Sequence, residues 1–184
     1  MKANRMPDIP KLQAYVLTEK LGESLLSQVY KGYHKHRPDQ PLVLKLLKLQ
    51  AGWDNRLRYL QQKVERLKVL QDPRAGMPIA LDFDNGVQII VNSWFVGQTL
   101  ADWMAQRLVI NLADFFMIAC ALTDTLQAVH EAGITHGGIK PHNILVQPDA
   151  LTIRITDFIT PLDIRDVSHF IYDPEFVRNT LAYT

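Results

Sequence analysis

The stretch His136-Gly137-Gly138-Ile139-Lys140-Pro141-His142-Asn143 decides how this sequence is interpreted. It follows a long apolar segment that stops at Gly133, where a glycine is typical of the end of a helix. It precedes the short apolar run 144–146, which is typical of a β-strand. The stretch is therefore predicted to connect a helix to a strand.

The segment before this stretch predicts a long helix over residues 112–132, with Asn111 as its N-cap. A second helix is predicted from Asp54 to the stop at Asp72-Pro73, and a short one over 100–107. The second helix rests on apolar residues that recur every three or four positions, namely Leu57, Leu60, Val64, Leu67 and Leu70.

Strands are predicted over residues 15–21, 27–33, 42–47, 79–83, 87–91, 144–146 and 152–155. Asp84-Asn85-Gly86 joins two of them as a hairpin, because Asn-Gly between apolar runs favours a tight turn. A meander of strands that carries one helix, followed by a helical part, predicts an α+β fold. Its lobes would be residues 1–92 and 98–184, with a hinge at 93–97.

Composition excludes several classes of protein. The chain has 184 residues, is 47% apolar and carries a net charge of +1, which argues against a nucleic-acid surface built on positive charge. Its single cysteine, Cys120, excludes an internal disulfide and is expected to be a small buried apolar residue. The apolar run 115–122 is shorter than the roughly 20 residues of a membrane span, and no secretory signal begins the chain. We therefore expect a cytoplasmic protein that binds neither nucleic acid nor a membrane.

Five motifs in this order resemble those of the protein kinases. Residues 21–29 resemble the phosphate-covering loop, and residues 42–45 stand where kinases have V-A-I-K. The opening stretch resembles H-R-D-x-K-P-x-N, and Asp157-Phe158-Ile159 resembles D-F-G. Thr180-Leu181-Ala182-Tyr183 resembles the start of the segment that leads to A-P-E. The resemblance covers residues 15–184 and implies a two-lobed kinase-like fold. It has an antiparallel sheet with one helix in the N-lobe and an incomplete helical C-lobe.

The runs 43–48 and 180–183 are also similar to the N-terminal kinase-like domain of large bacterial kinase–NTPase–sensor fusion proteins.

The resemblance implies an ATP and Mg²⁺ site. Lys45 would hold the α- and β-phosphates, Glu65 would hold Lys45, and Lys140 matches the lysine of the Ser/Thr class that faces the transferred phosphate. Asn143 and Asp157 would be the oxygen ligands of Mg²⁺. The remaining nucleotide contacts would be Leu21, Gly22, Val29, Val43, Ser93, Phe95 and Leu145. Taken without the resemblance, Lys45 could be a solvated lysine at a strand end, Glu65 an ordinary helix charge beside Lys68, and Asn143 a turn cap.

Several residues depart from the kinase pattern. Gly138 replaces the catalytic base, whose proton transfer contributes about 10²–10⁴-fold to rate. Gly137 replaces the arginine that commonly pairs with a phosphorylated activation loop, and Ile159 replaces the glycine of D-F-G. Ser24 and Ser27 add Cβ atoms where glycines let the loop approach phosphate. Val43, which stands where kinases usually have alanine, would narrow the adenine slot.

These departures predict a catalytically impaired kinase-like domain that signals through interaction. Two alternatives stay open: an active Ser/Thr kinase fragment with an unconventional base, and a scaffold without a nucleotide. Because the segments that cover the helix 112–132 in kinases do not appear before Thr184, we also expect that helix to expose an apolar face. Self-association or a protein partner would then cover it.

Overall fold

The computed structural model describes residues 10–24, 27–48, 54–70, 72–107, 109–147, 149–150 and 152–159. The chain divides into two compact units, one of residues 1–51 and 80–94, the other of residues 52–79 and 95–184. The last of the three boundaries follows Trp94, inside the expected hinge, whereas residues 52–79 group with the second unit rather than with the first.

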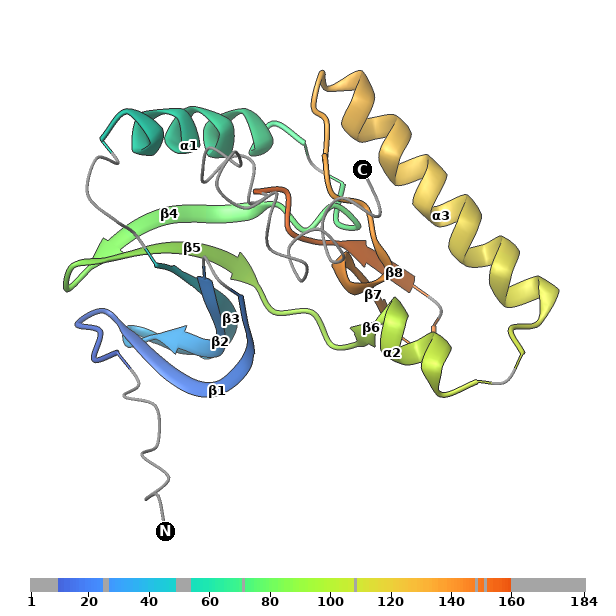
Figure 1. Cartoon of the computed structure of the whole chain (residues 1–184), viewed down its shortest axis with the longest axis horizontal. Helices are drawn as coiled ribbons and strands as arrows, with labels where there is room; N and C mark the ends of the chain where they lie inside the picture. The colour runs from blue at the N-terminus through green and yellow to red at the C-terminus, as the bar shows by residue number, and fades with distance from the viewer. Residues whose placement is uncertain are drawn as a thin grey trace, which may run out of the picture. The chain divides into compact units, whose positions relative to one another are not determined.

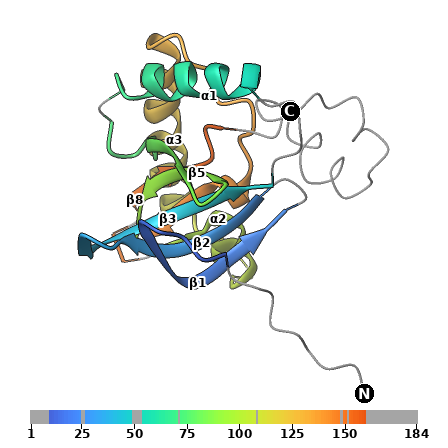
Figure 2. The same cartoon turned by 90° about the vertical axis from the view of Figure 1, so that its left-hand side faces the viewer.

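The first unit is built on an antiparallel sheet. Its strands are β1 (Tyr15–Glu23), β2 (Ser27–His34), β3 (Arg37–Leu47), β5 (Val87–Ser93) and β4 (Pro78–Asp84), in the order β1-β2-β3-β5-β4. Figures 1 and 2 show β1, β2 and β3 side by side with β1 at the edge. All five predicted strands of this region are present.

One face of this sheet forms the core of the first unit. Tyr30 on β2 lies opposite Leu44 on β3, which lies opposite Val91 on β5, so that the three side chains share a face. All three are buried. Because successive side chains of a strand alternate between faces, the residues beside Leu44 belong to the other face.

The turn between β4 and β5 contains Asn85 and Gly86, both at positive φ, as the Asn-Gly signal predicts. Asp84 just before it is buried and accepts the backbone N–H groups of Gln13 (2.8 Å) and Ala14 (2.7 Å). This carboxylate therefore fixes the segment that leads into β1.

The second unit combines helices with a small sheet. Its helices are α1 (Asp54–Leu67), α2 (Leu100–Ala105), α3 (Leu112–Glu131) and the 3₁₀ turn η1 (Pro141–Asn143). The sheet has the order β6-β7-β8, from β6 (Gln98–Thr99), β7 (Ile144–Gln147) and β8 (Thr152–Ile155). The two-residue β6 and the single turn η1 are too short to leave a periodic signal, and the sequence did not predict them. A buried cluster joins the helices to this sheet: Trp103, Ile118, Ile144, Val146 and Ile153.

The long helix α3 begins and ends where the sequence predicts. The Asn111 side chain accepts the Asp114 N–H at 2.8 Å, and Gly133 follows the helix with φ +68°. Only one narrow face is buried, through Ile118, Thr125 and Val129. Cys120 is exposed, so the expectation of a buried thiol is wrong. It lies two residues beyond Ile118, which turns it away from the buried face.

Residues 72–76 lie along β8. Ala75 forms a parallel bridge with Ile155, through Gly76 N–H to Ile155 O (2.7 Å) and Ile155 N–H to Arg74 O (2.7 Å). A Cβ on Gly76 would lie 2.8 Å from the Ile155 carbonyl oxygen, so this contact requires glycine. The segment is thereby fixed beside the strand that leads to Asp157.

Candidate functional site

Lys45 lies on the face of the first sheet that is turned away from the Leu44 core. The register places Gly22 opposite Val29, Val29 opposite Lys45, and Lys45 opposite Ile90. Residues directly opposite one another share a face, and Val43 joins them two residues before Lys45. The structure thus brings together Gly22, Val29, Val43 and Lys45, four of the residues predicted to meet the nucleotide.

The other two predicted contacts of the first unit lie at or near strand ends. Leu21 is 40% exposed and lies at an irregularity in the pairing of β1 with β2. Ser93 ends β5, lies opposite Leu42 and is exposed.

The loop that resembles the phosphate-covering loop is held by its own side chains. The Ser24 N–H donates to Ser27 O (2.8 Å), the Ser27 N–H donates to the Ser24 hydroxyl (3.1 Å), and the two hydroxyl oxygens lie 3.1 Å apart. Serines at these two positions therefore supply hydrogen bonds within the loop that glycines could not make.

Glu23 extends this network to the neighbouring strands. Its carboxylate accepts Lys48 at 2.5 Å and Gln28 at 3.2 Å, and it also pairs with Lys20. These hydrogen bonds, that of Lys20 first and that of Lys48 next, lower the pKa of Glu23 to about 2. Lys48 also donates to Ser24 O at 3.0 Å, so that an ionised carboxylate and two lysines surround the loop. The sequence interpretation missed this cluster, in which Glu23 ends β1 and Lys48 follows β3.

In the second unit, His136 anchors the stretch 136–143. It is 2% exposed, and its ring lies against that of Phe158 with centroids 4.6 Å apart. Its Nε2 lies 2.8 Å from the Thr156 carbonyl oxygen. Because a carbonyl only accepts, Nε2 carries the proton and donates it. His136 therefore ties the start of this loop to the residues around Asp157.

Asn143 closes the same loop. Its side-chain amide donates to the Gly138 carbonyl at 2.8 Å, and its backbone N–H donates to Lys140 O at 2.8 Å. Gly138 and Lys140 are both half-buried. Gly137 between His136 and Gly138 has φ +72°, a conformation that suits glycine.

Asp157 directly follows Thr156, which forms hydrogen bonds with the backbone of Asn143. The backbone oxygen of Asn143 accepts the Thr156 N–H (2.8 Å) and the Thr156 hydroxyl (3.2 Å), which brings both predicted Mg²⁺ ligands to one end of the β7–β8 hairpin. Asp157 has φ +67°, which is uncommon for a residue with a side chain, although aspartate tolerates it better than most. Backbone conformations of this kind cluster at functional sites.

These two residues fit a magnesium ion. The amide nitrogen of Asn143 is committed to Gly138, which leaves its side-chain oxygen as an acceptor beside the Asp157 segment. The described residues contain no group of three or more His, Cys, Asp or Glu side chains placed to hold a metal. Two protein oxygens suit Mg²⁺, which keeps several waters and shares its shell with phosphate.

Two further predicted contacts share a neighbour. Leu145 on β7 lies opposite Arg154 on β8, and the Arg154 guanidinium lies 4.9 Å from the centre of the Phe95 ring. Phe95 and Leu145 are both half-buried. Arg154 thus connects the predicted adenine contacts of the second unit.

Glu65 lies on the exposed side of α1, away from the buried Leu60 and Val64, and it pairs with Lys68 one turn further on. This is the helix-charge alternative noted above. The predicted pair of Glu65 with Lys45 stays a prediction, because these residues belong to different units. The segment 180–183 lies outside the described residues, so the likeness to bacterial fusion proteins stays a prediction as well.

Comparison with known proteins agrees with the motifs. Residues 15–177 match the family model described as protein kinase domain. The chain is 25% identical over 150 residues to the serine/threonine-protein kinase ULK3 of Xenopus laevis, a match that covers 81% of this chain and 32% of that protein. It is 25% identical over 147 residues to the serine/threonine-protein kinase TIO of Arabidopsis thaliana, covering 80% of this chain and 11% of that protein.

Among solved structures, the chain resembles the kinase domain of Mycobacterium tuberculosis PknI with a TM-score of 0.67 and 24% identity, covering 81% of this chain and 59% of that domain. At this identity the likeness shows the fold alone. The chain spans about a third of the length of the Xenopus kinase that it matches.

Proposed function

The chain belongs to the protein kinase family, and from this premise we propose that it is a catalytically impaired, Ser/Thr-type kinase-like domain. It would keep a nucleotide and magnesium site and act in signalling through interaction. The chemistry of phosphoryl transfer asks the protein chiefly for positioning and charge neutralisation, and these can outlast the loss of the base.

The observation that carries this proposal is the glycine at position 138. The surrounding loop is well formed, since Asn143 bonds the Gly138 carbonyl and His136 is anchored to Thr156. Within this formed loop, Gly138 has no side chain that can accept a proton from a hydroxyl or orient it. Loss of a positioned base removes about 10²–10⁴-fold in rate.

The neighbouring histidines are poor substitutes. His136 is buried and donates its Nε2 proton to a backbone carbonyl, so this nitrogen cannot accept one. His142 lies on η1 and is exposed to solvent. Neither stands at the position that the kinase motif gives to its base.

Each unit keeps residues for the proposed contacts with nucleotide and magnesium. Lys45 would neutralise phosphate charge, with Gly22, Val29 and Val43 on the same sheet face. Asn143 and Asp157 would supply oxygens to Mg²⁺, which when bound offsets the charge of the phosphates. Lys140 would remain as a positive charge near the transferred group.

A second function, a scaffold without nucleotide, is favoured by the loop network. Ser24 and Ser27 satisfy each other, and Glu23 places a carboxylate where phosphates would approach. Nucleotide would have to compete with these interactions.

Thermal unfolding with and without ATP and Mg²⁺ tests the nucleotide site. We expect stabilisation of about 2.7 kcal/mol at a hundred times Kd, which Lys45→Ala and Asp157→Ala should abolish. If ATP with Mg²⁺ does not change the unfolding temperature and Lys45→Ala has no effect, the domain is a scaffold without nucleotide and our proposal of a nucleotide site is wrong. Transfer of labelled γ-phosphate by the unaltered chain, lost in Asp157→Ala, would instead show an active kinase and overturn the impaired state.

A further inference from the structure

The helix α3 carries a second stripe, of four apolar and two polar residues, beside the one that faces the core. Its members are spaced alternately by four and three residues, the spacing of a coiled-coil seam: Leu112, Phe116, Ala119, Thr123, Leu126 and His130. Ala119, Leu126 and His130 each come one residue after a core-facing position (Ile118, Thr125 and Val129), so the stripe lies about 100° round the helix from the core. We call these six residues the α3 seam.

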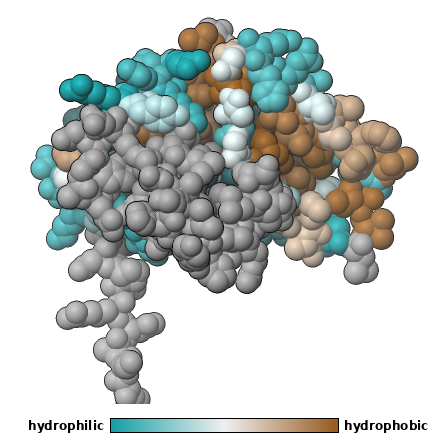
Figure 3. Space-filling model, turned by 45° about the horizontal axis from the view of Figure 1, so that its top comes forward, coloured by the Kyte–Doolittle hydropathy of each residue, from teal (hydrophilic) through white to brown (hydrophobic). Residues whose placement is uncertain are grey.

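Four of the six seam residues are exposed, and Ala119 and Leu126 are half-buried. Leu112 is 68% exposed and Phe116 is 54% exposed, while Thr123 and His130 are also exposed. Figure 3 shows hydrophobic surface gathered on its right-hand side, where α3 lies in Figure 1. Exposed apolar surface of this kind marks a site of association.

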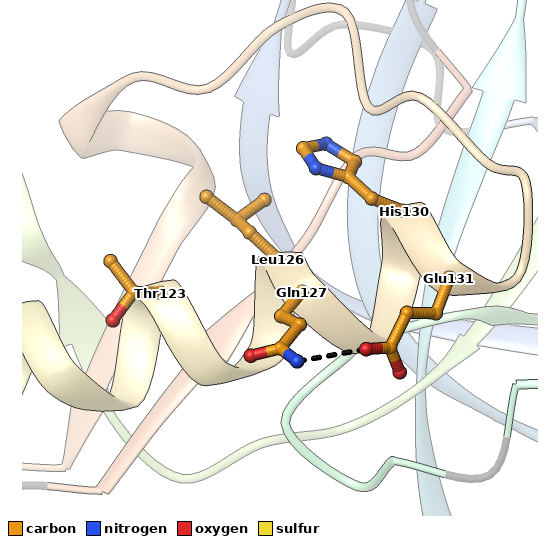
Figure 4. A pocket seen from close by; sticks show the side chains of 5 residues that line it. All are labelled: Thr123, Leu126, Gln127, His130 and Glu131. Carbon is orange, nitrogen blue, oxygen red and sulfur yellow. Dashed lines mark hydrogen bonds between the residues drawn. The ribbon is translucent and has the colours of Figure 1, made fainter.

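The C-terminal half of the seam borders an open hollow of about 550 Å³. It is lined by Thr123, Leu126 and His130 of the seam, with Gln127 and Glu131 beside them (Figure 4). The N-terminal half offers projecting side chains instead, because Leu112 and Phe116 stand out from the surface. The side chains that project from the N-terminal half of α3 could thus fill the hollow beside its C-terminal half.

We propose that the α3 seam pairs with the α3 seam of a second copy of this chain, antiparallel, about a two-fold axis beside residues 119–123. In that register Phe116 faces Leu126 of the other copy, Leu112 faces His130, and Ala119 faces Thr123. Every seam residue then has a seam partner, as a self-complementary two-fold interface requires. The small Ala119–Thr123 layer at the centre lets the helices approach closely, while Phe116 enters the hollow beside Leu126.

Charge selects the antiparallel direction. The helix carries Asp114, Asp124 and Glu131 and has no lysine or arginine. A parallel pair would bring identical carboxylates to the same level. In the antiparallel pair Glu131 instead lies level with Asn111, the N-cap of the other helix, where the helix dipole favours negative charge.

A membrane is the competing occupant. Among the described residues α3 is the one helix long and apolar enough to cross a bilayer by length and composition. Its packing favours a protein partner, because Ile118, Thr125 and Val129 are buried against the domain and Arg74 lies 3.7 Å from Asp124. A spanning helix would have to give up these contacts.

This self-association rests on the interaction role proposed above, because it names the partner. It is tested without nucleotide, so the nucleotide site and the self-association can fail independently. By light scattering the 184-residue chain should show twice the 21.0 kDa mass of one chain. Phe116→Asp should halve that mass. Met117→Asp should not, because Met117 is nearly as exposed on the same helix but lies outside the seam.

Cys120 reports the direction of the helices. It is exposed, is the only cysteine and lies within one residue of the axis. A bis-maleimide with a short spacer should therefore link two copies. Ala113 occupies the same flank one heptad earlier, so Ala113→Cys in a Cys120→Ser background should link poorly in an antiparallel pair and efficiently in a parallel one.

Three results would overturn the proposal. These are a monomer at all concentrations, a dimer that Phe116→Asp leaves intact, and equal linking through Cys120 and the Ala113→Cys variant. Flotation of a monomeric chain with phosphatidylcholine vesicles would assign the seam to a membrane instead. Circular dichroism of Phe116→Asp verifies that any loss of mass does not come from unfolding.

Discussion

The side-chain amide of Asn143 donates a 2.8 Å hydrogen bond to the backbone carbonyl of Gly138. Asn143, which is predicted to bind Mg²⁺, therefore also fixes the backbone at Gly138, where kinases have the catalytic base. Since the bond ends on a backbone atom, it does not depend on the side chain at position 138. The shape of the loop can thus persist although its proton acceptor is absent.

Because Asn143 has both roles, substitutions at Asn143 and Asp157 can distinguish an effect on stability from an effect on metal binding. Asn143→Ala removes the bond to Gly138 and should lower the free energy of unfolding by about 1 kcal/mol, and it should remove the Mg²⁺-dependent part of the ATP shift. Asp157→Asn replaces the carboxylate ligand by an amide that tolerates the same positive φ, and it should reduce the ATP shift with less effect on unfolding in urea. An Asn143→Ala variant as stable as the unaltered chain would contradict the role of the hydrogen bond.

Gly137 offers a prediction about the missing arginine. Its φ of +72° disfavours any residue with a Cβ, although a Cβ there would meet nothing within 4 Å. Gly137→Ala should therefore cost about 1–2 kcal/mol from backbone strain alone, measured by urea unfolding. Gly22→Ala is the matched control, since its Cβ also meets nothing and its φ is not positive. Equal effects of the two substitutions would show that strain is not the cause.

The sequence predicted the elements of this fold better than their ends. Period and capping located α1 and α3, and Asn85-Gly86 located a hairpin. β3 begins at Arg37 rather than at residue 42, because Pro41 pairs with Tyr33 of β2 while the partner strand β5 joins only from Leu42. Up to Leu42, β3 has an open side, where a strand tolerates proline. No local pattern signals which neighbour a strand acquires at which residue.

The candidate site was predictable as residue types and spacings. Motif order identified Lys45, Asn143 and Asp157. It did not identify the contacts that fix them, because these end on backbone atoms, as His136 does on Thr156 O. Cys120 was misjudged for a related reason: an apolar run shows that a helix is amphipathic or buried, but not how narrow its buried face is.

Tyr15 should make the first unit sensitive to alkaline pH. Its hydroxyl donates to Asp82 at 2.8 Å, and burial together with this hydrogen bond raises the pKa of Tyr15 above its ordinary value. The unfolded chain loses this proton near about pH 10, while the folded chain keeps it to higher pH. The free energy of unfolding should therefore fall as pH rises above about 10.

The matched variants isolate this effect. Tyr15→Phe should lower the free energy of unfolding by about 1 kcal/mol at neutral pH and should flatten its decline in alkali. Tyr33→Phe alters a half-buried tyrosine on the neighbouring strand β2 and should have less effect on both. The comparison is made by urea unfolding from neutral pH to about pH 11. A decline as steep in Tyr15→Phe as in the unaltered chain would assign it to other groups.

The Glu23 cluster makes the last prediction, about the affinity for nucleotide. At neutral pH Glu23 is ionised, since the hydrogen bonds from Lys20 and Lys48 hold its pKa at about 2, and its charge opposes that of an approaching phosphate. Glu23→Gln removes this charge and releases both lysines, so the Kd for ATP should fall about two- to five-fold, as expected for an exposed ion pair. Glu19→Gln makes the same charge change on the same strand and should have less effect. Titration at low and high salt measures both, and the gain should shrink at high salt because ions screen exposed charges. An equal gain from Glu19→Gln would mean that net charge, and not the cluster around the loop, sets the affinity.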